Sequence, residues 1–249
     1  MLLSIGCEWR LSSTDDGQDW LVSVSRFDRV QSLYLTTGDY SALQQMNTDY
    51  PQQTRTLIED VLRLGRVNDP AINARFLTFY QDTTLQSIIL ETERQYADMT
   101  DVNRQLSESF ERLLKEMPGL CIPDVYAQIG ALDQSIIVGH DMIGISLDKY
   151  LGSDNPVYLK YGYSARQRQS MQRSYIVPDC IAFYLLSLYP LRDDSLVTQE
   201  ERDRHIGGIQ WVVNRVTRRH VFNSGHVDAA AGWMKGHPGS TFEQLLKTV

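Results

Sequence analysis

The chain lacks any long apolar run. Although 42% of its 249 residues are hydrophobic, no stretch approaches the ~20 consecutive apolar residues of a membrane-spanning helix. It also has few cysteines: Cys7, Cys121 and Cys180, without CxxC spacing. That pattern excludes a zinc site built from cysteines and a disulfide-rich scaffold. Cys180 lies in an apolar helical run and is expected to be buried, whereas a Cys121–Cys180 disulfide is left open.

The chain has fewer basic residues than acidic residues. The chain carries 24 Lys and Arg against 31 Asp and Glu, a formal net charge of −7. A protein that binds nucleic acid needs a basic face to displace counterions from the phosphates, so we expect no nucleic-acid partner. The local basic cluster at 215–220 is interpreted as a helix end, where cations complement the helix dipole.

Catalytic motifs are missing as well. The sequence contains no GxSxG elbow, P-loop or GxGxxG, and no two of its five histidines stand at i, i+4 as in a zinc-binding helix. His140-Asp141 follows an expected strand, but a satisfied or solvent-facing histidine is the simpler interpretation. Asp148 and Asp179 could form an acid–base pair. However, Pro178-Asp179 better suits the first turn of a helix, where the carboxylate meets the positive end of the dipole. We therefore predict no catalytic residue, no metal site and no cofactor.

The N-terminus carries a signal of another kind. In MLLSIGC, small residues directly before Cys7 match the cleavage pattern of bacterial lipoprotein signals, in which that cysteine becomes the acylated first residue. The preceding residues lack a positive region and a full apolar core, so on this interpretation the start codon lies upstream or the chain is truncated. Residues 1–20 would be a signal remnant and a polar tether. The alternative is an ordinary buried strand with Cys7 as a core thiol.

The rest of the chain, 21–249, is predicted to form a single α+β domain, mostly helical with a small central sheet. Alternation of apolar and polar residues predicts a strand over 21–30. Helical spacing predicts helices from Pro51 to Gly65, near 70–81 and 83–97, and over 98–117. Three strands of one sheet are expected at 123–130, 134–141 and 142–148. Helices return after 174, and capping boxes at Thr198–Glu201 and Ser240–Glu243 mark two helix starts.

Several motifs together resemble one bacterial family. SRFD at 25–28, LRLG at 62–65, GISLDKYLGSDNPVY at 144–158 and YIVPDCIAFYL at 175–185 are similar to segments of the gliding motility lipoprotein GldB family, over about 22–191. The resemblance implies a lipid-anchored protein of the bacterial cell envelope, facing the periplasm or the cell surface. It also implies a link to gliding and to the associated secretion system, and it favours Cys7 as the lipidation site. The region after 198 departs from the family pattern.

The same family resembles predicted zinc-dependent proteases, which implies a zincin-like architecture. In those proteases a strand of the ISLDxxL kind precedes a helix with HExxH, whose histidines bind zinc and whose glutamate activates a water. In the corresponding register, Pro178 and Asp179 replace His-Glu and Ala182 replaces the second histidine. Proline and alanine cannot bind zinc, so the resemblance implies a helix that has lost its metal site and a protein that is not an enzyme.

A protease cleft without its chemistry can still bind an extended peptide. By analogy, we expect a binding groove lined by Asp148, Lys149 and Tyr150, with Tyr175 and Asp179 at the start of the following helix. The alternative is that LDKYLG is only a turn needed for folding. The expected function is non-catalytic binding or assembly with an unidentified envelope protein. The rivals are a peptidase with unrecognised ligands, such as His140 with C-terminal histidines, and a purely structural subunit.

Overall fold

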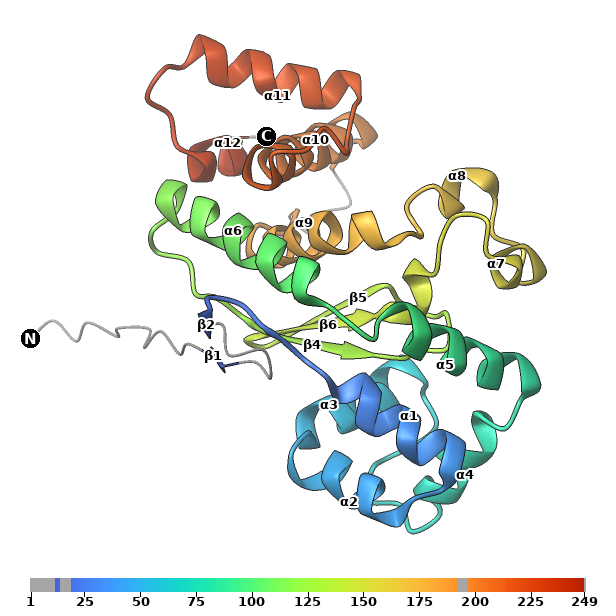
Figure 1. Cartoon of the computed structure of the whole chain (residues 1–249). Helices are drawn as coiled ribbons and strands as arrows, with labels where there is room; N and C mark the ends of the chain where they lie inside the picture. The colour runs from blue at the N-terminus through green and yellow to red at the C-terminus, as the bar shows by residue number, and fades with distance from the viewer. Residues whose placement is uncertain (1–11, 14–18, 192–196, 249) are drawn as a thin grey trace, which may run out of the picture. The chain divides into compact units, whose positions relative to one another are not determined.

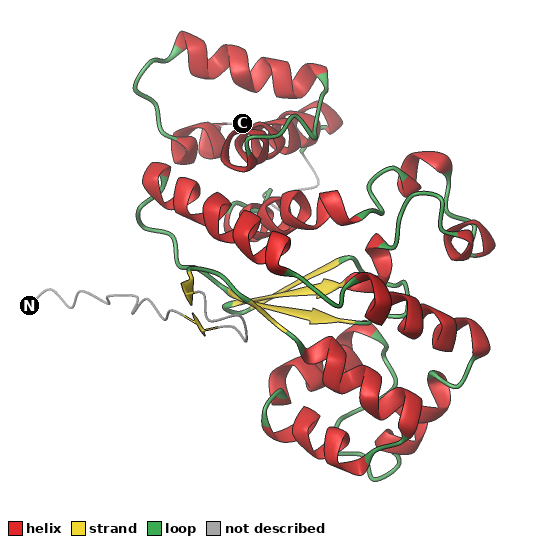
Figure 2. Ribbon diagram, in the orientation of Figure 1, coloured by secondary structure: helices red, strands yellow, loops and turns green. Residues whose placement is uncertain are grey.

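The computed structural model describes residues 12–13, 19–191 and 197–248. Its helices and strands confirm a mostly helical α+β chain with a small sheet (Figure 2). The strands are β1 (Ser12–Ser13), β2 (Asp19–Trp20), β3 (Val24–Ser25), β4 (Asp124–Gln128), β5 (Ile136–Gly139) and β6 (Met142–Ser146). The α-helices are α1 (Phe27–Thr37), α2 (Tyr40–Thr48), α3 (Pro51–Arg55), α4 (Ile72–Phe79), α5 (Thr83–Gln95), α6 (Thr100–Glu116), α7 (Pro156–Lys160), α8 (Ala165–Arg168), α9 (Ile176–Leu188), α10 (Gln199–Thr217), α11 (Gly225–Gly236) and α12 (Phe242–Thr248). A π-helix (Thr56–Val61) and two 3₁₀ turns (Leu147–Tyr150 and Arg173–Tyr175) complete the set.

The chain divides into two compact units, each described here by itself. The sheet unit comprises Val24–Met99 and Val125–Ile176, and the helical unit comprises Met1–Ser23, Thr100–Asp124 and Val177–Val249. The chain passes from one to the other several times, so the sequence-based expectation of one domain over 21–249 stays a prediction. Within the segment predicted as a tether, β1 and β2 pair antiparallel, and Cys7 lies outside the described residues.

The sheet unit contains a four-stranded sheet in the order β3-β4-β6-β5. β3 runs parallel to β4, and β5 and β6 form an antiparallel hairpin. Residues 125–128 of β4 and 143–146 of β6 are all buried, as expected for central strands covered on both faces. The three strands predicted between 123 and 148 are therefore confirmed. In Figure 1, α1 to α5 gather beside this sheet.

The predicted strand over 21–30 is wrong beyond its first half. β3 ends at Ser25, and α1 begins at Phe27. Phe27, Gln31, Tyr34 and Leu35 are buried at helical spacing, so from Phe27 the chain follows the 3.6-residue period of a helix. The alternation that predicted a strand is confined to LVSVS, too short to outweigh the helical pattern behind it.

The helical unit is built around α6, α9, α10, α11 and α12 (Figure 1). Helix α6 buries Leu106, Phe110 and Leu113 along one stripe, and α10 packs on α6, α11 and α12. The capping box at Thr198 and Glu201 is confirmed. The second one is shifted by one residue: Thr241 and Gln244, rather than Ser240 and Glu243, exchange the reciprocal hydrogen bonds at the start of α12.

Candidate functional site: the groove beside helix α5

Asp148, expected to line a groove, lies in the interior with 0% of its surface exposed. One carboxylate oxygen accepts a hydrogen bond from the Gly130 N–H (2.7 Å) and the other from the Leu132 N–H (2.5 Å). These bonds hold Ala131 and Leu132 at φ 52° and 65°, in the left-handed region that residues with side chains seldom adopt. Burial raises the pKa of Asp148, and the hydrogen bonds from Gly130 and Leu132 partly offset that rise.

Lys149 and Tyr150 are also occupied by internal contacts. The Lys149 ammonium donates to the Tyr163 hydroxyl (2.9 Å) and the Leu132 carbonyl (3.3 Å) and lies 4.5 Å from the centre of the Tyr163 ring. Tyr150 is 1% exposed, and its carbonyl accepts a hydrogen bond from the Tyr96 hydroxyl at 2.6 Å. For Asp148, Lys149 and Tyr150, the contacts therefore favour the alternative interpretation, a turn needed for folding.

The remaining predicted groove residues lie in different units. Tyr175 ends the second 3₁₀ turn in the sheet unit and is partly exposed. Asp179 is a partly exposed residue in the first turn of α9 in the helical unit, as the Pro178-Asp179 pattern predicted. A groove lined by both stays a prediction.

Helix α9 contains the IVPDCIA segment, which the resemblance to zinc-dependent proteases predicts to correspond to HExxH. It spans Ile176–Leu188, so Pro178, Asp179 and Ala182 all lie on it. Cys180 is fully buried in the same helix, as predicted, and no disulfide joins it to the exposed Cys121. His140 is 95% exposed in the β5–β6 turn and contacts its neighbour Asp141. Across the described ranges, no three His, Cys, Asp or Glu side chains gather as metal ligands would.

A groove that the sequence did not predict lies between α5 and α7. Its volume is about 700 Å³, within the usual range for ligand sites. Ten residues line it: Thr83, Thr84, Ser87, Ile88, Glu91, Leu151, Asn155, Pro156, Val157 and Lys160. Leu151, Asn155, Pro156 and Val157 belong to the LDKYLGSDNPVY segment that resembles the GldB family, and Lys160 lies two residues after it.

Local signals in the sequence account for both walls of this groove. Asp82 accepts hydrogen bonds from the backbone N–H groups of Thr84 and Leu85 and so starts α5. Asn155 directly precedes Pro156, the first residue of α7, and its side chain accepts a hydrogen bond from the Val157 N–H. The Asn-Pro pair was therefore the signal for a helix start beside LDKYLG, but nothing in the sequence places that helix against residues 83–91.

Half of the polar side chains that line the groove are hydroxyls, those of Thr83, Thr84 and Ser87. The Lys160 ammonium donates to the Thr84 hydroxyl at 2.6 Å, and the Ser87 hydroxyl donates to the Thr84 carbonyl at 2.7 Å. Glu91 accepts hydrogen bonds from Arg94 and Gln95, which lower the pKa of its carboxyl group. A hydroxyl acts as a nucleophile when a general base lies within hydrogen-bond reach. Ser87 donates instead to a backbone carbonyl.

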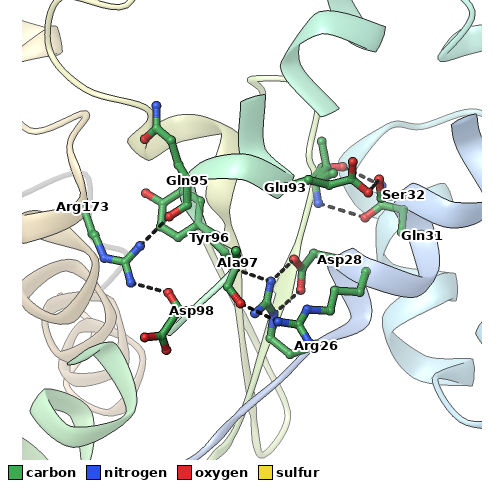
Figure 3. Close-up of polar contacts among 12 residues, drawn as sticks. Arg26, Asp28, Gln31, Ser32, Glu93, Gln95, Tyr96, Ala97, Asp98 and Arg173 are labelled. Atoms are coloured by element: carbon green, nitrogen blue, oxygen red, sulfur yellow. Dashed lines mark hydrogen bonds and ion pairs between the residues drawn. The ribbon is translucent and has the colours of Figure 1, made fainter. Parts of the chain in front are cut away.

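The opposite end of α5 is fixed by arginines from other elements (Figure 3). Arg26, of the SRFD motif, donates to the Tyr96 carbonyl (2.8 Å), and Arg29 donates to that of Ala97 (2.6 Å). Arg173 donates to the carbonyls of Gln95 and Asp98. Cations here satisfy carbonyl groups that the helix leaves unpaired and complement its dipole.

The segment after Tyr150 also contacts α5 directly. The Gln95 side chain donates to the Leu151 carbonyl at 3.0 Å, and the buried Tyr158 hydroxyl accepts from the Leu151 N–H and donates to the Asp148 carbonyl, both at 2.8 Å. Two of the motifs that resemble the GldB family therefore position helix α5. SRFD contacts its end, and LDKYLGSDNPVY lies along its side.

In the described part of the chain, no helix is both long and apolar enough to cross a membrane. No curated protein and no solved structure gives a significant match. A family model described as gliding motility protein GldB matches residues 12–199, about three quarters of the chain, and it includes every residue that lines the groove. This chain is a member of the gliding motility protein GldB family.

Proposed function

We propose that the protein is a cell-envelope lipoprotein, anchored through Cys7, that works as a non-catalytic binding or assembly component related to the gliding and secretion machinery. Family membership supports the link to gliding motility. The observation that carries the binding role is the groove, because a segment that resembles the family supplies one of its walls.

Two features support binding rather than catalysis. The groove offers hydroxyls, one asparagine, one lysine and a carboxylate already held by Arg94 and Gln95, and its Ser87 hydroxyl donates to a backbone carbonyl rather than to a general base. In the predicted zinc-protease register, Pro178 and Ala182 of α9 take the places of the two zinc-binding histidines, and neither side chain has a donor atom for a metal.

The experiment fills the groove. Ser87 is exposed on the groove wall, so Ser87→Trp should block a partner while the helix core stays intact. In a strain deleted for this gene, we expect the Ser87→Trp variant to lose most of the restored gliding or secretion. Leu90→Trp is the matched control, since Leu90 is 58% exposed on the same helix and does not line the groove.

Both variants must give wild-type thermal melting, so that loss of function is not loss of fold. Full restoration by Ser87→Trp would mean that the groove has no part in the function. The alternative of a metal-dependent peptidase is tested on protein purified without chelators: stoichiometric zinc would support it and contradict the non-catalytic proposal.

A further inference from the structure

Lys160 differs from the other charged groups around the groove. It is exposed at the end of α7, and its ammonium donates to the Thr84 hydroxyl at 2.6 Å. Among the described residues, no carboxylate forms an ion pair with it. A lysine that meets a neutral hydroxyl keeps donors available for an anion that enters from solvent.

The neighbouring carboxylates are already satisfied by the protein. Asp82 accepts hydrogen bonds from the N–H groups of Leu85 and Thr84 and from the Thr84 side chain, which lower its pKa, and Lys160 adds a smaller contribution. Glu91 forms its ion pair with Arg94. Lys160 therefore interacts with the Asp82 carboxylate without forming an ion pair with it, and the ammonium contacts the Thr84 hydroxyl instead of a carboxylate.

Next to this cation, the groove is apolar. Ile88 and Leu151 are buried beneath it, and Pro156 and Val157 form part of its wall. In an extended peptide, alternate side chains point the same way and are about 6–7 Å apart. A peptide could therefore place one side chain on Lys160 and the side chain two positions away on the apolar residues.

We propose that the groove binds an extended segment of a partner protein through an acidic side chain, whose carboxylate pairs with Lys160. An apolar side chain two positions away packs on Ile88 and Leu151. This inference rests on the proposed binding function and defines the chemistry of its partner.

The test is selection from a phage-displayed library of random dodecapeptides on the purified protein. Enriched peptides should share an Asp or Glu with an apolar residue two positions away. For a synthetic peptide of that sequence, Lys160→Gln should weaken binding about tenfold at low salt, as should Asp→Asn in the peptide. Lys235→Gln, the same change on α11 outside the groove, should leave binding unchanged.

Charge reversal sharpens the result. Selection on the Lys160→Glu variant should enrich Lys or Arg at the position where wild type enriches Asp or Glu. One result would overturn this inference: Ser87→Trp blocks the binding of the selected peptides, but the peptides show no acidic preference and bind Lys160→Gln as tightly as wild type. That result would leave the groove proposal intact. If no selected peptide depends on the groove, both fail.

Discussion

The burial of a polar side chain can depend on residues that are far away in the sequence. Asp148 is the last residue of the strand predicted over 142–148, next to a loop, where exposed functional side chains are common. It is buried because residues 130–132 fold back onto it and supply two N–H donors. The predicted strand end lies two residues beyond the observed end at Ser146, and the sequence does not show that a loop sixteen to eighteen residues earlier will cover the carboxylate.

Two buried tyrosines of the sheet unit give a matched pair of substitutions. The Tyr158 hydroxyl makes two hydrogen bonds to backbone groups, whereas that of Tyr126 has no hydrogen-bond partner among the described residues. We expect Tyr158→Phe to lower the free energy of unfolding by roughly 2–4 kcal/mol, because it leaves buried backbone groups unpaired. Tyr126→Phe should be neutral or stabilise by up to about 1 kcal/mol.

Urea unfolding of both variants measures the difference. Equal losses of stability would show that the two hydroxyls have equivalent surroundings, contrary to the contacts described above.

At the scale of elements, local signals predicted helix starts well and element ends less well. Pro51 begins α3 as expected, but the continuous helix predicted to Gly65 passes into a π-helix at Thr56 and ends at Val61. A π-turn needs one extra residue per turn. Leu57, Ile58 and Val61 are all buried there. The periodicity of LIEDVLRLG did not reveal the π-turn.

The C-terminal end of helix α5 is held by a residue that is far away in the sequence, Arg26. Arg26 makes a two-pronged ion pair with the buried Asp28 and also donates to the Tyr96 carbonyl. We expect Arg26→Ala to lower the free energy of unfolding by roughly 2–4 kcal/mol, because it leaves the Asp28 carboxylate buried without this partner.

Arg94→Ala is the control from the same helix. Arg94 pairs with Glu91 on the surface, and exposed pairs of this kind contribute little, so chemical denaturation should detect almost no change. A similar loss for both variants would contradict the distinction between a buried and an exposed arginine pair.

At the scale of the whole molecule, the family match and the compact units have different boundaries. The match ends at residue 199, where α10 begins, whereas the helical unit continues through α10, α11 and α12. Arg112 of α6 donates to the Val216 carbonyl of α10 at 2.7 Å, so these helices pack on a segment that lies inside the match. The region after 198 therefore lies outside the matched family pattern, but its helices pack within the helical unit.

Membrane anchoring is a property of the whole protein and follows from the lipoprotein proposal. We expect Cys7→Ala, expressed from the native gene, to move the protein from the membrane fraction to the soluble fraction, because the acylated residue is lost. Cys121→Ala is the control, since Cys121 is exposed and is not bonded to Cys180. Membrane retention of the Cys7→Ala variant would remove Cys7 as the anchor.

The sequence by itself determined the helical stripes, the three strands between 123 and 148, the cap at Thr198 and the family. Each of these depends on neighbouring residues, because periodicity and capping act within one or two turns of chain. Only the tertiary structure decided that Asp148 and Tyr150 are internal and that α7 lies against α5 to form the groove. Those features require contacts between segments 16 to 76 residues apart, whose pairing depends on how the whole unit packs.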